Sequence, residues 1–277
     1  MIDLHSHSTA SDGSLSPHEL VQHALRQGLT ALSLTDHDTV SGIDEAIASA
    51  RGTGLNLIPG IEIEAAWEDR GVFHVLGLGV DHTSIVMQAL IPIIQGLRTR
   101  RNNLILGRMA AAGIHATMDN IAGKLDSTII TRPHFADYLI SIGLVKDRQQ
   151  AFDQYLTPGK PFFEPYPGLP LETIVETIHN AKGKSVVAHP LSLYVSWGRM
   201  EKLMHEWKAI GVDGIETWHP SASWNDAKRL DKLAMAAGLR ISAGSDFHGT
   251  ARPDRILGKT LEERHTIDDR FMALFDE

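Results

Sequence analysis

Histidine and aspartate recur at short spacings near the start of the chain. His5 and His7 are two residues apart, they follow the apolar Ile2 and Leu4, and Asp12 comes after a turn of small residues. In a β-strand, residues two apart project from the same side, so both imidazoles could bind one ion. First-row divalent metals accept such mixed nitrogen and oxygen ligands. The segment predicts a metal site, and the alternative is a strand with two solvated histidines.

More histidines and acids follow apolar segments, at positions expected to be strand ends. Functional groups gather at the carboxyl ends of strands in parallel α/β proteins, because loops there vary without disturbing the core. Removing so many polar groups from water without basic partners would cost too much free energy unless cations bound at the same site. The residues concerned are Asp36, His37, Asp38, Glu62, Glu64, His74, His189, Glu216, His219, Asp246 and His248.

The composition limits the chemistry that these residues can perform. The chain has 277 residues, of which 43% are hydrophobic and 22% are charged, as expected for one α/β domain with possible additions. It contains no cysteine, so disulfides and thiolate zinc sites are excluded, and its 15 histidines and its carboxylates are the strong metal ligands. The net charge of −8 argues against a broad nucleic-acid-coating surface. Bound cations could still make one pocket positive enough for a small anionic substrate.

The expected location is the cytoplasm. The sequence has no long uncharged apolar run, and its first residues carry acid and histidine rather than a basic segment followed by an apolar one. We therefore expect neither a transmembrane helix nor a signal peptide. No membrane association and no stable protein partner are expected.

Apolar periodicity and capping signals predict the elements that would position these groups. Ser16 is expected to cap a helix with Pro17 at its first position. Repeated β-α units with short connections favour parallel strands, and about seven of them indicate a barrel rather than an open sheet. The expected strands are 2–5, 31–35, 55–63, 72–80, 185–188, 214–217 and 240–243. The expected helices are 16–27, 42–51, 84–112, 171–181, 200–210 and 225–237.

The alternation is interrupted between residues 101 and 170. This part holds short helical pieces and the proline-rich segments 158–161 and 165–170. We expect residues 1–100 and 171–277 to form the barrel. Residues 101–170 would form a small, mostly helical subdomain inserted into it that caps the substrate.

The insert contains two candidate anion-binding groups. Pro133 suits the first turn of a helix, whose free amides would face an anion together with Arg132 and His134. A surface helix that happens to begin with these residues is the alternative. The second group consists of Arg101, Asn102 and Asn103. Taken alone, these residues would be interpreted as a solvent-exposed helix face. If they lie beside the metal ligands, they could bind phosphate oxygens.

These motifs together resemble the polymerase and histidinol phosphatase (PHP) family, in the same order from Asp3 to His248. The family implies a distorted seven-stranded β/α barrel with a trinuclear metal site at its C-terminal mouth. The insert with Arg132-Pro133-His134 resembles small phosphatases and exonucleases that act on nucleotide 5′-phosphates more than the PHP modules of replicative polymerases. The motifs are His5-x-His7, Asp12, Thr35-Asp36-His37-Asp38-Thr39, Gly60-x-Glu62, His74, His189-Pro190 and Asp246-x-His248.

The resemblance implies a ligand set for two to three divalent ions per chain. Mn²⁺ is the expected ion, with Fe²⁺ or Zn²⁺ as alternatives, because all three suit nitrogen and oxygen ligands. Asp12 or His248 could also transfer protons, although both are implied ligands. One ion would be bound by His5, His7, Glu62 and Asp246, a second by Asp12, His37 and His248, and a third by Glu62, His74 and either His134 or His189.

Several neighbouring residues leave alternatives open. Glu64 shares a strand face with Glu62 and could bridge ions in its place, but Gly60 and the motif favour Glu62. Asp36 and Asp38 are interpreted as acids that orient His37 or hold a loop, since ligand histidines often donate their second nitrogen to a carboxylate. Structural roles are favoured for the remaining two rim residues, Glu216 and His219.

The expected activity is metal-assisted phosphoester hydrolysis. A nucleoside 3′,5′-bisphosphate or the 5′ end of a short RNA would give each anion-binding group of the insert a partner. The alternatives are a histidinol-phosphate phosphatase or another small-molecule phosphatase, a hydrolase of C–N bonds on a related barrel, and a metal-bound structural module without activity.

Overall fold

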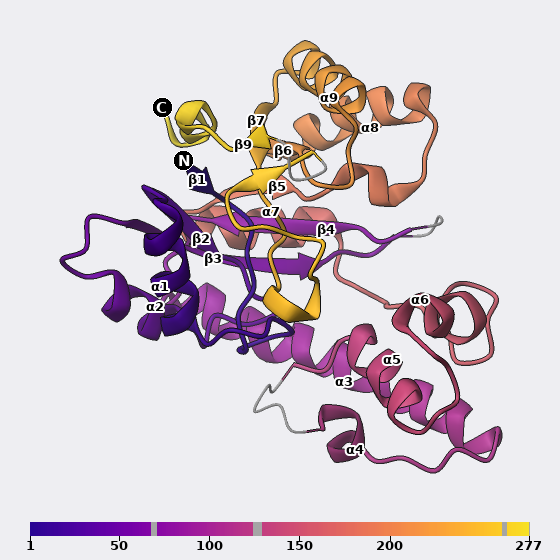
Figure 1. Cartoon of the computed structure of the whole chain (residues 1–277). Coiled ribbons are helices and arrows are strands. Elements are labelled where there is room, and N and C mark those ends of the chain that lie inside the picture. Colours follow the sequence, from indigo (N-terminus) through magenta and orange to yellow (C-terminus); the bar gives the residue numbers. More distant parts are fainter. Residues whose placement is uncertain (68–70, 124–128, 262–264, 277) are drawn as a thin grey trace.

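Seven strands form a single, nearly closed barrel sheet. The computed structural model describes residues 1–67, 71–123, 129–261 and 265–276. The strands follow one another around the sheet in chain order (Figure 1). The two ends of the sheet meet where the N–H of His7 donates to the carbonyl of Phe247, 2.8 Å away. The strands are β1 (Ile2–Asp3), β2 (Ala31–Leu34), β3 (Asn56–Glu64), β4 (His74–Leu78), β5 (Lys184–Val187), β6 (Gly214–Trp218) and β7 (Arg240–Ala243).

Strand β4 runs against its neighbours. The pairs within β1–β2–β3 and within β5–β6–β7 are parallel, whereas β4 is antiparallel to both β3 and β5. The expectation of parallel strands is therefore wrong for β4, because β3 and β4 are joined directly as a hairpin without a helix. The reversal pairs His74, at the start of β4, with Glu64, at the end of β3. It thus brings His74 to the same mouth as the carboxyl ends of the other strands.

Helices cover the outside of the barrel close to the predicted positions. Helix α1 begins after Ser16, whose hydroxyl accepts from the N–H of Glu19, with Pro17 in the first turn, as predicted. Its buried face includes Leu20 and Val21, which belong to the main apolar core. In Figure 1, α8 and α9 lie beside β5 to β7, and α1 and α2 lie beside β2. The bounds are α1 (Pro17–Gln27), α2 (Ile43–Ala50), α7 (Leu171–Asn180), α8 (Trp197–Ile210) and α9 (Trp224–Ala237).

The C-terminal segment was not predicted as regular structure. It forms the strand pair β8 (Lys259–Thr260) and β9 (His265–Thr266) and the 3₁₀ helix η4 (Asp269–Phe275). Phe271 and Leu274 of η4 are buried in an apolar cluster that also contains Ile2 of β1. Within the described residues, no helix combines the length and hydropathy needed to cross a membrane.

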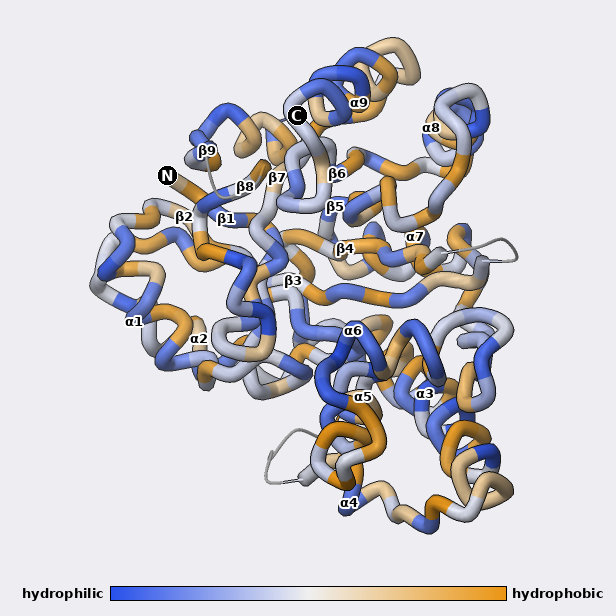
Figure 2. Tube along the Cα trace, turned by 45° about the vertical axis from the view of Figure 1, so that its right-hand side comes forward, coloured by the Kyte–Doolittle hydropathy of each residue, from blue (hydrophilic) through white to orange (hydrophobic). Residues whose placement is uncertain are grey.

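The inserted part has an apolar core of its own. Helix α3 (Ile85–Ala111) crosses the boundary expected at residue 101: Leu90 and Ile94 pack in the barrel core, whereas Ile105 and Met109 pack in a separate cluster. Figure 2 shows α3, α4 and α5 as a lobe below the barrel with its own apolar segments. The other helices of this lobe are α4 (Met118–Ala122), α5 (Arg132–Ser141), α6 (Arg148–Ala151) and the π-helix η1 (Phe152–Leu156).

We expect Phe135→Ala to destabilise the insert selectively. Phe135 is fully buried in the separate cluster, and truncation of a buried phenylalanine costs about 3–5 kcal/mol. Ile142→Ala is the control, because Ile142 is 45% exposed and follows the same helix. Chemical denaturation followed by fluorescence should show a lower unfolding midpoint for Phe135→Ala alone. Equal midpoints for the two variants would show that this cluster contributes little to stability.

Candidate active site

The carboxylate of Glu62 lies at the centre of the barrel mouth. Glu62 is 1% exposed and projects from β3. Its oxygens are surrounded by imidazole nitrogens from four different segments of the chain. Oε2 lies 3.3 Å from Nε2 of both His5 and His7 and 3.1 Å from Nδ1 of His37, and Oε1 lies 2.8 Å from Nδ1 of His74 and 3.0 Å from Nε2 of His189.

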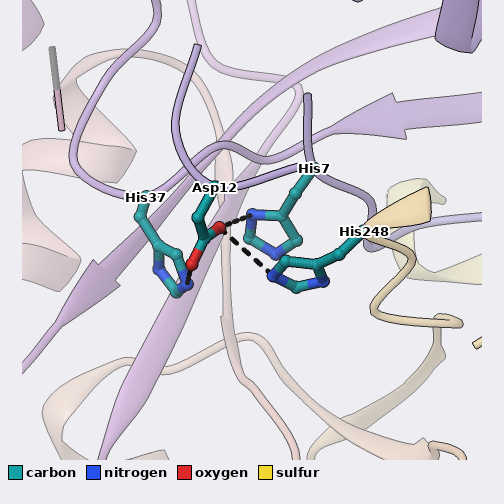
Figure 3. A group of neighbouring side chains, drawn as sticks. All are labelled: His7, Asp12, His37 and His248. Carbon is teal, nitrogen blue, oxygen red and sulfur yellow. Dashed lines mark ion pairs between the residues drawn. The ribbon is translucent and has the colours of Figure 1, made fainter. Parts of the chain in front are cut away.

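Four groups of three or four side chains have ligand atoms close enough to bind one ion. Figure 3 shows one of them, in which Asp12 lies between His37 on one side and His7 and His248 on the other. The nine residues implied as metal ligands all occur in these groups, and His134 occurs in none of those found among the described residues. The groups are His7, Asp12, His37 and His248; His5, His7 and Asp246; His5, Glu62 and His189; and His37, Glu62 and His74.

The donor set fits divalent cations. Within the described part of the chain, Nδ1 of His7, Nδ1 of His37 and Oε2 of Glu62 are buried and make no hydrogen bond, although the last two lie 3.1 Å apart. The rings of His7 and His248 stack with centroids 4.1 Å apart. So many desolvated polar atoms would be costly unless a cation bound them.

A cavity of about 1040 Å³ opens above these groups. Its floor includes Asp12, Glu62 and Asp246. One wall is formed by Thr131 and Arg132 of the insert. Further arginines in the lining were not predicted as site residues, because they lie far apart in sequence: Arg98, Arg148, Arg252 and Arg255.

Comparison with known proteins identifies the family. A model of the PHP domain family matches residues 3–155. The chain belongs to the PHP domain family. A 5′-3′ exoribonuclease of Haemophilus influenzae is 42% identical over 246 residues, which cover 89% of each chain. A 3′,5′-nucleoside bisphosphate phosphatase of Chromobacterium violaceum is 36% identical over 260 residues, 94% of this chain and 91% of that protein.

A solved structure from Chromobacterium violaceum has the same architecture. It is described as an amidohydrolase with bound sulfate and no metal. It superposes with a TM-score of 0.85 at 35% identity, covering 96% of this PHP chain and 91% of the other. The predicted family and the barrel with an insert are thereby confirmed.

Close contacts between acids and imidazoles shift the pKa values at the centre of the PHP site. Burial alone would raise the pKa of Glu62, but nearby imidazoles, that of His74 foremost, hold it well below its ordinary value. Burial alone would lower the pKa of His7, but its contacts with Asp246 and Glu62 raise it to about 10. Burial dominates at His37 and lowers its pKa to about 3. Before an ion binds, the site would therefore hold ionised carboxylates with at least one protonated imidazole.

Asp3 ties the two ends of the barrel together. Its buried carboxylate accepts from the backbone N–H groups of His5, Ser245 and Gly258, at 3.2, 3.0 and 2.7 Å. Asp246 in turn donates its N–H to the carbonyl of His5, 2.9 Å away, and has a φ of 51°. A left-handed conformation is strained for aspartate, and such strain concentrates at functional sites. These contacts bring His5 and Asp246 into one group.

The other acids of the rim hold loops and ligands. Asp36 accepts from both the N–H and the hydroxyl of Ser8, at 2.8 and 2.6 Å, and so holds the loop that leads to Asp12. Asp38 pairs with Arg98 at 2.6 Å. Both therefore hold loops, one of the two roles considered for them.

Glu216 and His219 adjoin the predicted ligands. Glu216 lies 3.1 Å from Nδ1 of His5 and accepts from the N–H of His189 at 2.8 Å, so it orients two ligands. Nε2 of His219 lies 3.4 Å from Asp246. Both residues therefore contact predicted metal ligands.

Glu64 has different partners from Glu62. Its carboxylate lies 3.3 Å from Arg132 and 3.7 Å from Arg98. Burial alone would raise the pKa of Glu64, but these arginines, Arg132 first, lower it to about 2. Glu64 is therefore placed as a counterion for arginines, whereas Glu62 is surrounded by histidines.

The insert reaches the candidate metal ligands through Thr131. The N–H of Thr131 donates to Nδ1 of His134 at 2.9 Å, and its hydroxyl donates to Oδ2 of Asp12 at 3.0 Å. His134 thus closes the cap at the start of α5, and the structure places His189, rather than His134, beside Glu62. Thr131 was not predicted, although Thr-x-x-His at a helix start has the spacing of a capping box.

The second predicted group of the insert is divided between two environments. Arg101 is 1% exposed, and within the described chain its three guanidinium nitrogens have no hydrogen-bond partner. Burial, reinforced by the charge of Arg98, lowers the pKa of Arg101 to about 9. Asn102 donates to the carbonyl of Ile130 at 2.9 Å and so holds the chain before Thr131. Asn103 is exposed, outside the cavity lining.

We expect metal binding to this PHP chain to release protons and to tighten as pH rises. At pH 7 the imidazole of His7, with a pKa raised to about 10, is protonated and must lose that proton to bind an ion. Calorimetric titration with Mn²⁺ in two buffers of different ionisation enthalpy would measure the release. Binding without proton release at pH 7 would contradict this charge assignment.

Two matched substitutions separate the neighbouring glutamates. Glu62→Gln should lose most of its bound divalent ions, because Glu62 contributes to two of the four candidate groups. Glu64→Gln should keep them, since Glu64 contacts arginines. Elemental analysis of both purified variants, with circular dichroism as a folding check, provides the measurement. Equal ion loss in both variants would mean that the two roles are not separate.

Proposed function

We propose that this chain is a divalent-metal-dependent phosphoesterase. It removes the 5′-phosphate of nucleoside 3′,5′-bisphosphates or acts at the 5′ end of short RNA, in the cytoplasm. The observation that carries this proposal is Glu62, which lies among five imidazoles at the floor of a cavity lined by arginines. The names of the relatives from Haemophilus influenzae and Chromobacterium violaceum support the same class of substrate.

The nine grouped side chains would hold two to three divalent ions, with Mn²⁺ expected. When bound, such ions supply Lewis acidity, which neutralises phosphate oxygens and makes a nearby water molecule more acidic. The chain itself contributes orientation: the hydroxyl of Thr131 and Nε2 of His248 both contact the carboxylate of Asp12. Nδ1 of His248 lies 2.8 Å from the carbonyl oxygen of Asp246. An N–H at Nδ1 would donate to this carbonyl, and the other ring nitrogen, Nε2, faces Asp12.

Asp12 and His248 are in direct contact. Oδ1 of Asp12 lies 3.2 Å from Nε2 of His248. Burial alone would raise the pKa of Asp12, but the imidazoles of His37 and His248 hold it well below its ordinary value, so Asp12 remains an acceptor. Nε2 of His248 and the carboxylate of Asp12 therefore face each other at the edge of the cavity.

The arginines on the α3 side of the cavity would bind a second phosphate. Arg132 lines the cavity, and Arg101 is a buried cation without a hydrogen-bond partner in the described chain. A guanidinium binds phosphate bidentately, and burial strengthens such a contact. His134 and Asn102 support this region by holding the start of α5. Asn103 remains a candidate contact only for a substrate that extends beyond the cavity.

Rival substrates are distinguished by their charge. Histidinol phosphate carries an amine, which would need an acid in place of the arginines at the cavity wall. An amide substrate, which the description of the structural relative suggests, has no phosphate to satisfy these cations. Both therefore fit the lining less well than a nucleotide with two phosphates.

The experiment that tests this function is an activity panel with metal-reconstituted protein. The substrates are a nucleoside 3′,5′-bisphosphate, a 5′-mononucleotide, a short 5′-phosphorylated RNA, the same RNA with a blocked 5′ end, histidinol phosphate and an amide. We expect the bisphosphate and the free 5′-phosphorylated RNA to react fastest and the blocked RNA to resist. Products that keep the 5′-phosphate, or preference for histidinol phosphate or the amide, would overturn the proposal.

Arginine substitutions in this region should affect doubly phosphorylated substrates most. A charge-assisted hydrogen bond contributes about 1.5–3 kcal/mol. Arg132→Ala should therefore lower kcat/KM for a bisphosphate by about ten- to more than hundredfold. Arg101 is buried and outside the cavity lining, so Arg101→Ala should lower it less. Activity on a simple chromogenic phosphate ester should fall much less.

The matched control is Arg100→Ala. Arg100 is the exposed neighbour of Arg101 on the same helix, and its removal should change neither substrate. If the ratio of bisphosphate to chromogenic activity is the same in all three variants, the α3 side of the cavity does not select the substrate.

A further inference from the structure

The cavity has a second basic wall, on the segment that follows His248. This segment contains the 3₁₀ turn η3 (Gly249–Ala251), and two of its side chains, Arg252 and Arg255, line the cavity. We infer that Arg252 and Arg255 form an additional anion subsite, which binds a phosphate or phosphodiester group of the substrate other than the one that is cleaved. This inference rests on the proposed function.

The two basic walls differ in how fully their charges are neutralised. Arg98 pairs with buried Asp38 at 2.6 Å, and Arg132 lies 3.3 Å from buried Glu64. Arg148 also has a counterion: both ends of its guanidinium bond to Asp137. Three of the five arginines that line the cavity thus already have a carboxylate partner.

Arg252 and Arg255 share a single carboxylate that solvent screens. The side chain of Asp254 is 63% exposed and lies 3.5 Å from Nε of Arg252 and 3.3 Å from Nε of Arg255. Exposed ion pairs of this kind contribute little. Among the described side chains, Arg252 and Arg255 carry two positive charges and share the one negative charge of Asp254. About one positive charge is therefore not neutralised by Asp254.

Arg255 is also an unsatisfied buried cation. It is 9% exposed, and its Nε makes no hydrogen bond in the described residues, although the carboxylate of Asp254 lies 3.3 Å away. Arg255 lines the same cavity as Asp246. Burial lowers the pKa of Arg255, and the charge of Asp246 opposes that shift. A desolvated donor without a partner is costly, and the planar fork of arginine matches phosphate oxygens. A bound phosphate would satisfy it.

The segment is held in place before any substrate arrives. The N–H of Thr250 donates to the hydroxyl of Ser14 at 2.8 Å, and the N–H of Ser14 donates to the carbonyl of His248 at 3.0 Å. A guanidinium N–H of Arg148 on the insert donates to the carbonyl of Ala251. A subsite on a fixed segment loses less entropy when it binds its ligand.

The test compares substrates that differ in their number of phosphate groups. Arg252→Ala, Arg255→Ala and the double variant are assayed with a 5′-mononucleotide, a 3′,5′-bisphosphate and a 5′-phosphorylated trinucleotide. For at least one of the two longer substrates, the ratio of its kcat/KM to that of the mononucleotide should fall about tenfold or more. A fall for the bisphosphate would show that this wall shares the 3′-phosphate with Arg132, and a fall for the trinucleotide alone would identify a later phosphodiester as the ligand.

The control is Arg199→Ala, an arginine with a 44% exposed side chain on α8 that pairs with Glu206. It should leave both ratios unchanged. Arg252→Lys and Arg255→Lys, with thermal unfolding measured for every variant, separate lost binding from lost folding. Unchanged ratios in the folded double variant would overturn the subsite.

A binding measurement separates this inference from the proposed function. Calorimetric titration of the metal-loaded protein with a nucleoside 3′-monophosphate and with a dinucleotide lacking the 5′-phosphate does not depend on turnover. The double variant should bind at least one of the two about tenfold more weakly than the unmodified chain. Equal binding of both ligands would overturn the subsite even if hydrolysis were confirmed. Weaker binding alongside failed hydrolysis would retain the subsite and reject the activity.

Discussion

The burial of one carboxylate among several imidazoles governs the organisation of this protein. Glu62 is 1% exposed, yet histidines from four segments approach its two oxygens within 2.8 to 3.3 Å. Such a concentration of desolvated polar groups is unfavourable by itself and becomes favourable when cations are bound. The barrel brings these groups together from separate strands.

Two features of the fold make that convergence possible. The hairpin of β3 and β4 reverses one strand, so that His74 starts where its neighbours end. Asp3 joins the first strand to the segment after the last one, which places His5 beside Asp246. The insert then reaches back to the centre through the hydroxyl of Thr131 on Asp12. The insert and the candidate metal ligands are therefore in direct contact.

Local signals in the sequence predicted much of this arrangement. Apolar periodicity located the seven strands, the capping pattern at Ser16 located the first helix, and short histidine and aspartate motifs indicated the family. The direction of β4 was predictable but was missed, because the short connection between the strands expected at residues 55–63 and 72–80 has no room for a helical crossover. The roles of Thr131 and of Arg252 and Arg255 depend on contacts across more than a hundred residues, which periodicity does not report. The metal roles of the nine ligands remain predictions.

The most direct test of this account is an anomalous X-ray diffraction measurement on crystals of the protein grown with Mn²⁺. We predict two to three anomalous peaks at the barrel mouth, with the carboxylate of Glu62 bonded to at least two of the ions. His5, His7 and Asp246, and Asp12, His37 and His248, should complete the coordination of separate ions. A single peak, or ions bound without Glu62, would contradict the central role assigned to this carboxylate.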